Sequence, residues 1–418
     1  MNALSAPRGM HDLVAPGSEI RQRLEHTLIE LAHNYGFFPI RTPLAEQLEL
    51  FKRSVGETTD IVEKEMYLLQ QEGSRQLALR PENTAGCVRA LLQHSLPLPQ
   101  KLYYLGPMFR YERPQAGRYR QFHQFGVEFF GGEAPVADCE IIALCCAIWN
   151  RLGMNPRLEI NYLGSREERR AFNRKLVAFL QRHEDRLDSD SRKRLGRNPL
   201  RVLDSKHPDT LALLDHAPNL HDFLQPQSRA AFEELQQGLN RLGIAYTINP
   251  RLVRGLDYYN DLVFEWTSEH LGAQAAVCAG GRYDQLCADL GGGGAPATGF
   301  ALGLERLGLI LESGGLLSPP PQADAVLVWA NQGDAFDKLD LLTQLRAALP
   351  RMRVVGVTGN MHKQLNKADK LGARLALIVG ASERESGQVT LKYLREEKEQ
   401  TTIPLATLAS HFQPEPAD

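Results

Sequence analysis

The sequence has no apolar run long enough to span a bilayer, although 43% of its 418 residues are hydrophobic. Its first residues, MNALSAPRGMHDLVAPG, lack the basic and apolar regions of a signal peptide. The six cysteines form no CxxC pair and have no histidine spacing that indicates a zinc site. We therefore expect a cytoplasmic protein without disulfides and without a metal bound tightly by protein ligands.

The sequence also lacks a strong excess of one charge, since 48 Lys and Arg residues are balanced by 50 Asp and Glu residues. This balance argues against a protein that coats nucleic acid indiscriminately, but it permits local basic surfaces. One such excess lies in residues 166–201, which contain 12 basic and 6 acidic residues. We interpret it as part of a helical insertion, about residues 166–250, with a basic face. A solvated helix surface would explain the charges equally well.

The stretch SGGLLSPPPQADA, residues 313–325, predicts a domain boundary. Three consecutive prolines cannot continue a helix and favour an extended spacer. We expect one domain over residues 1–322 and a second over residues 323–418. In the second domain the pattern predicts strands at 325–330, 353–358 and 374–379 and helices at 337–349 and 361–371. Strands and helices that alternate at these lengths are typical of a small α/β domain.

Residues 101–131, KLYYLGPMFRYERPQAGRYRQFHQFGVEFFG, predict a long antiparallel hairpin, because two aromatic runs flank a Pro- and Gly-containing loop. Side chains alternate between the two faces of a strand. This alternation places Tyr119, Phe125, Val127 and Phe129 on a core face, and Arg118, Arg120, Gln124 and Glu128 on the opposite face. On the first strand, Arg110 and Glu112 lie together. A solvated sheet face would show the same alternation, but the concentration of arginine favours a ligand-binding face.

The stretch RLVRGLDYYNDLVFEW, residues 251–266, places an arginine, a glycine, an aspartate and two adjacent tyrosines before an apolar run that predicts a strand. Such a set of side chains suits the lining of a pocket for a small polar molecule. Two neighbouring tyrosines beside a strand are more often part of a core or an interface. The residue types alone leave both interpretations open.

Several motifs together resemble those of class II aminoacyl-tRNA synthetases. FRYER (109–113) is similar to the second signature motif of that class and GFALGLERL (299–307) to the third. Within the class, LVRGLDYY (252–259) and AGGRYD (279–284) are similar to segments that mark the histidyl-tRNA synthetase family. With RGMHD (8–12) and LRPENTAG (79–86), the resemblance covers residues 8–307, and the domain after the linker resembles the family's anticodon-binding domain. Each motif is weak by itself, whereas the combination is highly specific.

The resemblance implies an α+β fold with a six-stranded antiparallel sheet and flanking helices in the catalytic domain, a helical insertion and a C-terminal α/β anticodon-binding domain. It also implies a homodimer that uses ATP with Mg2+ to ligate L-histidine to tRNA(His) through a histidyl-adenylate, releasing AMP and pyrophosphate. In that reaction a carboxylate must approach a polyanion. One like-charge pair at 4 Å costs roughly 4 kcal/mol at an effective dielectric constant of 20. Cations fixed in place before the reaction offset this repulsion.

The resemblance assigns roles to individual residues. ATP would be bound by Arg110, Glu112, Arg118 and Arg306. Histidine would be bound by Glu82, Thr84, Gln124, Glu128, Arg254, Tyr258 and Tyr259. Arg110 and Arg254 would be catalytic, with Arg254 in a place that many relatives give to a metal ion. Candidates for tRNA binding are Gln115, Arg120, Lys363, Lys367 and Lys370, although a solvated helix face explains the three lysines equally well.

Two alternatives to the enzyme remain. One is a regulatory subunit of ATP phosphoribosyltransferase, which resembles the catalytic core but typically lacks the histidine motifs and the anticodon-binding domain. The other is a module that senses uncharged tRNA, although no kinase motif accompanies it. One departure from the family also stands out: Asn83 replaces the usual glycine after Glu82. We expect asparagine to preserve the turn because it tolerates positive φ.

Overall fold

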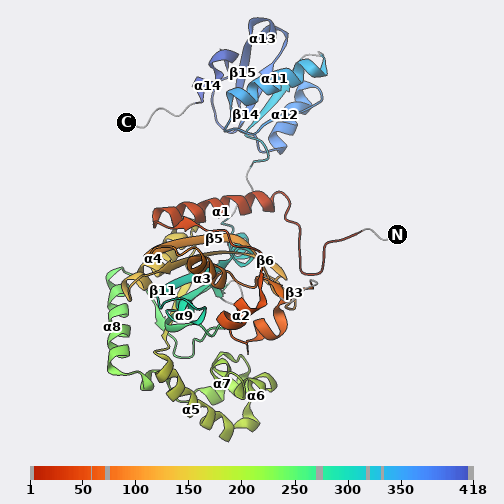
Figure 1. Cartoon of the computed structure of the whole chain (residues 1–418). Helices are drawn as coiled ribbons and strands as arrows, with labels where there is room; N and C mark the ends of the chain where they lie inside the picture. Colours follow the sequence, from red (N-terminus) through yellow and green to blue (C-terminus); the bar gives the residue numbers. More distant parts are fainter. Residues whose placement is uncertain are drawn as a thin grey trace. The chain divides into compact units, whose positions relative to one another are not determined.

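The computed structural model describes residues 4–57, 59–70, 76–269, 276–316, 321–330 and 334–412. The chain divides into two compact units, residues 1–318 and 319–418 (Figure 1). The division falls inside residues 313–325, the proline-containing stretch. Each unit has a hydrophobic core of its own. Within the described residues, no helix combines the length and the apolar character needed to cross a membrane.

The first unit is built on an eight-stranded sheet with the order β1-β5-β6-β11-β10-β9-β7-β8. In that order the strands are Phe38–Pro39, Gln100–Phe109, Gln121–Phe130, Ala297–Gly303, Ala276–Arg282, Asn260–Thr267, Arg157–Tyr162 and Thr247–Ile248. The six strands from β5 to β7 pair antiparallel, which confirms the predicted antiparallel sheet. The two outermost strands, each of two residues, add short parallel pairs that were not predicted.

The outer edge of β5 forms hydrogen bonds first with β1 and then with Arg80. β1 pairs only with Leu102 and Tyr103 of β5. Further along β5, Arg80 Nε donates to the Pro107 carbonyl at 3.0 Å, and the Arg80 carbonyl accepts from the Phe109 N–H at 2.9 Å. The outer edge of β5 is therefore occupied by several segments in turn rather than by one long neighbouring strand.

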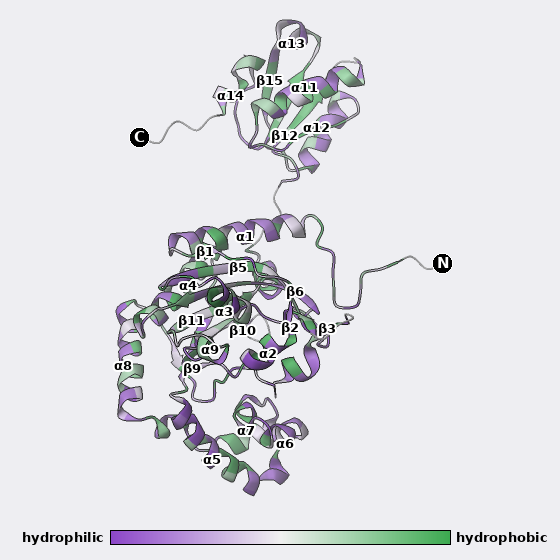
Figure 2. Cartoon of the chain, viewed as in Figure 1, coloured by the Kyte–Doolittle hydropathy of each residue, from purple (hydrophilic) through white to green (hydrophobic). Residues whose placement is uncertain are grey.

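Helices cover both faces of this sheet. The helices outside the insertion are α1 Gly17–Asn34, α2 Leu48–Val55, α3 Thr84–Gln93, α4 Val136–Leu152, α9 Leu286–Asp289 and α10 Leu304–Ser313. A small second sheet contains β2 Ala45–Gln47, β3 Tyr67–Leu69 and β4 Leu77–Leu79, and a short π-helical turn spans Ile61–Glu65. Helices α1, α4 and α10 pack on one face of the large sheet (Figure 1). In α1, hydrophilic and hydrophobic residues both occur along the helix (Figure 2), and Leu24, Leu28 and Leu31 form its buried face.

The insertion is helical, as the resemblance implies. It consists of α5 Arg166–Arg182, α6 Ser189–Leu195, α7 Pro208–Leu214 and α8 Pro226–Arg241, joined by short 3-10 turns. Helix α5 begins at a capping box, in which Ser165 Oγ accepts from the Glu168 N–H and Glu168 Oε2 accepts from the Ser165 N–H. Phe172, Leu176 and Leu180 are buried at helical spacing, so the many arginines of this helix lie outside its core face.

The predicted hairpin is present, but its loop is longer than expected. β5 ends at Phe109 and β6 begins at Gln121. Arg110 and Glu112 therefore follow β5, Arg118, Tyr119 and Arg120 precede β6, and the assignment of all five to strand faces was wrong. Inside β6, Phe125 and Val127 belong to one core. The opposite face is also covered, because Phe130 is buried in a second core. Of the polar side chains of this face, Glu128 is therefore buried and Gln124 is partly buried.

The second unit contains a five-stranded sheet with the order β13-β12-β14-β15-β16. Its elements are β12 Ala325–Trp329, α11 Ala335–Ala348, β13 Val354–Gly356, α12 Met361–Lys370, β14 Leu375–Val379, α13 Ala381–Ser386, β15 Gln388–Tyr393, β16 Thr401–Pro404 and α14 Leu408–His411. The elements up to β14 follow the predicted alternation. The two last strands, which were not predicted, extend the sheet antiparallel.

Candidate active site

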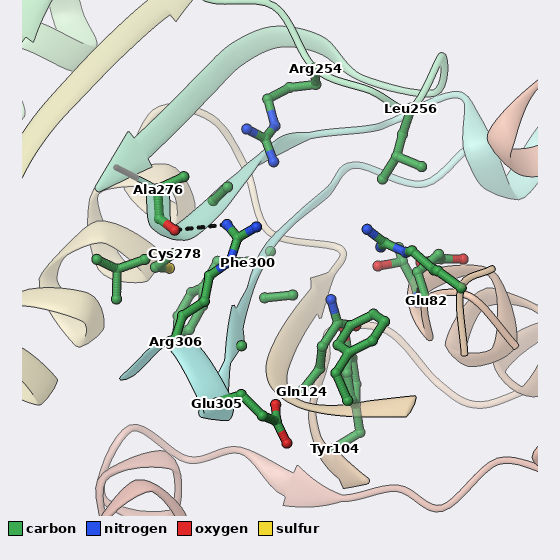
Figure 3. Close-up of a pocket in the computed structure, with 18 of the residues that line it drawn as sticks. Glu82, Tyr104, Gln124, Arg254, Leu256, Ala276, Cys278, Phe300, Glu305 and Arg306 are labelled. Carbon is green, nitrogen blue, oxygen red and sulfur yellow. Dashed lines mark hydrogen bonds between the residues drawn. The ribbon is translucent and has the colours of Figure 1, made fainter. Parts of the chain in front are cut away.

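A cavity of about 180 Å³ lies in the first unit (Figure 3). Every residue predicted to bind ATP or histidine lines it: Glu82, Thr84, Arg110, Glu112, Arg118, Gln124, Glu128, Arg254, Tyr258, Tyr259 and Arg306. These residues come from the hairpin, the α3 N-terminus, the segment before β9 and the start of α10. The fold therefore brings together side chains that are more than 200 positions apart in the sequence.

Glu128 is the most deeply buried acid in the cavity, with a relative exposure of 1%. The Thr84 hydroxyl donates to its Oε1 at 2.6 Å, and the Tyr283 hydroxyl donates to its Oε2. Burial raises the pKa of Glu128 to about 8, although both hydroxyl donors favour the ionised form. A ligand that supplies a further N–H donor would stabilise the carboxylate in this place.

Glycine at two strand positions makes room for this arrangement. Gly299 lies opposite Glu128 in the pairing of β6 with β11. A Cβ atom at Gly299 would overlap Glu128 Oε2 and the Val127 carbonyl oxygen. A Cβ atom at Gly126 would likewise overlap the Tyr104 ring and hydroxyl. These close approaches explain why side chains on neighbouring strands can meet in so small a space.

Three tyrosines form one wall of the cavity. The Tyr258 and Tyr259 ring centroids are 4.6 Å apart, and Tyr283 lies 5.5 Å from the first and 6.3 Å from the second. Burial raises the pKa of Tyr259 to about 12, although Arg254 lowers it. All three phenols therefore remain protonated at neutral pH and can donate hydrogen bonds. The sequence motifs indicated the first two tyrosines, whereas Tyr283 was not assigned a role.

Glu82 sits at the start of α3, where its carboxylate accepts backbone N–H groups of Thr84 at 2.7 Å and Ala85 at 3.0 Å. The neighbouring Asn83 has φ −122°, so the turn needs no positive φ and our expected reason for its tolerance was wrong. Its side chain instead accepts hydrogen bonds from Thr42 and from Arg80 Nη1. Asn83 thus connects the segment 82–84 to Thr42 and Arg80 of the same chain.

Positive φ occurs instead at Asp261, where it is 48°. Asp261 accepts a hydrogen bond from Asn260 Nδ2 at 2.8 Å, and it directly follows the residue at which β9 begins. Short polar side chains are the ones that tolerate this conformation best after glycine. The adjacent Leu262 is fully buried.

Arginines gather at the other end of the cavity. Arg110 donates from Nε to the Pro81 carbonyl at 2.9 Å and packs over the Phe122 ring at 5.1 Å. Arg118 lies 3.4 Å from the Glu112 carboxylate. The loop between β5 and β6 therefore presents two cations, of which Arg110 is held by backbone and ring contacts and Arg118 lies beside a carboxylate.

Arg254 and Arg306 complete this cationic end (Figure 3). Arg254 Nη1 is 2.7 Å from Glu265 Oε2 on β9. Burial acts to lower the pKa of Arg254, but Glu265 together with Tyr259 and Tyr258 outweighs burial and raises it. Arg306 donates to the Ala276 carbonyl at 3.0 Å and to the Gly117 carbonyl at 3.3 Å. Burial and the nearby Arg118 lower the pKa of Arg306.

The residues predicted to contact tRNA lie outside this cavity. Gln115 is exposed in the hairpin loop, whereas Arg120 stacks on the Tyr111 ring at 3.9 Å and donates to the Glu112 carbonyl. The candidate lysines of α12, Lys363, Lys367 and Lys370, are all exposed, and Gln364 and Ala368 form its buried face. Among the described residues, no group of three or more His, Cys, Asp or Glu side chains is placed to hold a metal ion.

An antiparallel sheet with arginines gathered over its cavity, a helical insertion and a separate α/β unit define a class II aminoacyl-tRNA synthetase. Residues 9–307 match the family model described as histidyl-tRNA synthetase, and residues 326–414 match the anticodon binding domain. The chain belongs to the histidyl-tRNA synthetase family.

Known relatives support this membership over nearly the whole length. The chain is 49% identical over 406 residues to a histidine–tRNA ligase of Hydrogenovibrio crunogenus, covering 96% of this chain and 95% of that protein. A crystal structure of apo histidyl-tRNA synthetase from S. aureus is similar with a TM-score of 0.78 and 34% identity, covering 98% of this chain and 100% of the other. A histidyl-tRNA synthetase structure from Nostoc sp. is similar with a TM-score of 0.70 and 25% identity, covering 98% and 99%.

Proposed function

We propose that this chain ligates L-histidine to tRNA(His) with ATP, through a histidyl-adenylate, and releases AMP and pyrophosphate. The observation that carries the proposal is a single cavity with hydroxyls around a buried carboxylate at one end and four arginines at the other. The first end suits an imidazole and the second suits phosphates. Both substrates of amino-acid activation would then meet in one enclosed space.

Histidine recognition would use Glu128 and Tyr259 on the two ring nitrogens. Neutral imidazole has one N–H donor and one lone-pair acceptor, so a selective pocket needs a complementary group at each nitrogen. Glu128 can accept a hydrogen bond, and the protonated Tyr259 can donate one. Tyr258 would line the ring. An amino acid that leaves these buried groups unpaired is rejected by a large factor.

The remaining acceptors would hold the α-amino group. Glu82, Thr84 and Gln124 line the same cavity as Glu128. Among the described residues, Gln124 Oε1 is a buried acceptor with no hydrogen-bond partner. An ammonium group would supply the missing donor. A buried acceptor without a partner carries a free-energy cost that such a ligand removes.

In the first reaction step, the histidine carboxylate oxygen would attack the α-phosphorus of ATP. The bond from that phosphorus to the bridging oxygen breaks, and pyrophosphate leaves with the electron pair. Arg110 and Arg254 would offset the charge on the α-phosphate, while Glu112, Arg118 and Arg306 would position the rest of ATP. In the second step, a ribose hydroxyl of tRNA(His) would attack the carbonyl carbon of the adenylate, and AMP leaves.

Arg254 would act at a place that many class II relatives give to a metal ion. Its contact with Glu265 fixes the guanidinium at the cavity wall and keeps it charged. Mg2+ would be held by the β- and γ-phosphates of bound ATP, where it neutralises their charge. This assignment agrees with the chemistry of the cavity, in which arginines outnumber carboxylates at the phosphate end.

We further propose a cytoplasmic homodimer that reads tRNA(His) with both units. Gln115 and Arg120 would lie near the 5' end of the tRNA, although the stacking of Arg120 on Tyr111 also gives it a role in holding the loop. The second unit would read the anticodon. Its exposed lysines Lys363, Lys367 and Lys370 would contact phosphates.

Exchange of pyrophosphate into ATP tests the central proposal, with each of the twenty amino acids in turn and without tRNA. Exchange that depends on histidine alone is the expected result. A folded protein that binds histidine but shows no exchange would instead match the regulatory paralogue. The anticodon-binding domain and the retained motif residues count against that alternative.

Alanine at all three α12 lysines tests the proposed tRNA surface. Binding of tRNA should weaken, and the slope of log affinity against log salt should flatten by roughly 0.7 to 0.9 for each phosphate that a lysine no longer neutralises. Pyrophosphate exchange should stay unchanged, because the cavity lies in the other unit. An unaltered salt slope would identify these lysines as an ordinary solvated face.

A further inference from the structure

Glu305 connects three segments of the first unit that are far apart in the sequence. It is the second residue of α10, and its carboxylate lies at the edge of the cavity (Figure 3). Its Oε1 accepts hydrogen bonds from Arg21 Nη2 and from His123 Nδ1, each at 2.9 Å. Its Oε2 accepts the His123 backbone N–H, also at 2.9 Å. Since Arg21 belongs to α1 and His123 to β6, one carboxylate joins α1, the hairpin and α10.

The charge of Glu305 is matched by its partners. The Glu305 and Arg21 side chains are each only 14% exposed, so solvent screens their ion pair weakly. Burial acts to raise the pKa of Glu305, but the contacts with His123 and Arg21 outweigh burial and lower it. An ionised carboxylate next to a site for a polyanion would repel it. Because Arg21 and His123 donate hydrogen bonds to the two carboxylate oxygens of Glu305, that repulsion is reduced.

A carboxylate beside an ATP site can alternatively be a ligand of Mg2+. Here the metal would have to compete with Arg21 and with two donors of His123. The described residues also contain no group of three acidic, histidine or cysteine side chains around Glu305 that could complete such a site. The contacts therefore favour an anchoring role.

The neighbour of Glu305 in the chain is Arg306. Consecutive helical residues point about 100° apart, so fixing one side chain fixes the direction of the next. Figure 3 shows the Glu305 carboxylate and the Arg306 guanidinium pointing in different directions from adjacent positions. The guanidinium reaches the carbonyls of Ala276 and Gly117. A displacement of about 1 Å at such a residue can reduce a rate by about 10²-fold.

We propose that Glu305 is a positioning residue that holds the first turn of α10 against α1 and β6 and so places Arg306 for ATP. This inference rests on the ATP-binding role proposed above for Arg306. Glu305 itself would not contact ATP. Its substitution should therefore alter the use of ATP and leave histidine recognition at the far end of the cavity intact.

Pyrophosphate exchange by the Glu305→Gln variant tests the inference. The KM for ATP and the KM for histidine are measured separately, by varying the concentration of each substrate. The KM for ATP should rise about tenfold, which is the smallest effect expected from losing hydrogen bonds to a charged group. The KM for histidine should change less than about twofold. Glu312→Gln is the matched control, because Glu312 is exposed at the other end of the same helix. The control should behave as wild type.

Arg21→Gln provides a second variant that keeps both contacts between Glu305 and His123. It should raise the KM for ATP by a smaller factor, and the double variant should be no worse than Glu305→Gln alone. If Glu305→Gln fails to fold by circular dichroism, the ATP dependence of Arg21→Gln decides the question. An unchanged KM for ATP in a folded variant overturns the inference. Absence of exchange in the wild type would instead overturn the proposed function.

Discussion

Replacement of Gly299 by alanine should damage histidine recognition while sparing ATP. A Cβ atom at this position would overlap Glu128 Oε2 and the Val127 carbonyl oxygen, far inside the 3.4 Å at which ordinary contact begins, and would lie 3.2 Å from the Tyr283 hydroxyl. The Val127 carbonyl is backbone and cannot turn away, so β6 and β11 must separate locally, and the Glu128 carboxylate must move as well. Each clash lies roughly 1 Å inside the ordinary contact distance of 3.4 Å, so the shift is of the same size. The 2.6 Å hydrogen bond from Thr84 would then be broken or badly strained.

The expected magnitude follows from that displacement. Hydrogen bonds to charged groups contribute about 1.5 to 3 kcal/mol, and each 1.36 kcal/mol is a factor of ten. We expect kcat/KM for histidine to fall by about 10²-fold in pyrophosphate exchange. The KM for ATP should stay within about twofold, because the arginines lie at the other end of the cavity.

Gly308→Ala is the matched control, since a Cβ atom at Gly308 on α10 would meet nothing within 4 Å. It should retain wild-type kinetics for both substrates. A folded Gly299→Ala protein with normal kinetics for histidine would refute the placement of the ring against Glu128. An equal loss for ATP and histidine would indicate collapse of the whole cavity.

Three further perturbations test other parts of the structure. Burial raises the pKa of Glu128 from 4.5 to about 8. Between these two values the folded ligand-free protein keeps a proton that the unfolded chain releases. The contribution of Glu128 to stability therefore falls as the pH rises from 5 to 8. Glu128→Gln should remove that fall. The thermal midpoint of the variant, relative to that of the wild type, should therefore rise as the pH approaches 8. Arg254→Ala should slow single-turnover adenylate formation sharply with little change in ATP affinity, and near-normal turnover would exclude its catalytic role. Asp138→Ala should cost about 1.5 to 3 kcal/mol, because it removes one carboxylate partner of Arg282, which is 1% exposed, while the ion pair with Asp284 remains. A thermal midpoint unchanged from wild type would contradict this last estimate.

Local patterns in the sequence predicted much of this fold. The aromatic runs around a Pro- and Gly-containing loop indicated the hairpin, and the alternation after the linker indicated the elements from β12 to β14. These features depend on periodicity and on turn residues within a short stretch. The same patterns could not show where the strand began, because Arg118, Tyr119 and Arg120 alternate like strand residues but lie in the loop.

The rest depends on contacts between distant segments. The neighbours of β6 are β5 and β11, and the second of these lies more than 160 positions further along the chain. Only that pairing places Gly299 opposite Glu128. The resemblance pointed to the residues that line the cavity, but it assigned nothing to Tyr283 or Glu265, whose hydrogen bonds are made to residues in the predicted set. The AGGRYD motif was the one available signal for Tyr283.

The short strands at the two ends of the large sheet have a consequence for the behaviour of the protein during synthesis and storage. Unpaired N–H and C=O groups along an outermost strand form a template on which another chain can add, and this is a common start of aggregation. Here each outermost strand has two residues, and one of the four is Pro39, which has no N–H to offer. Along β5, the guanidinium of Arg80 places a buried charge where an incoming strand would have to dock. A wide sheet is thus left with little edge for another chain to extend.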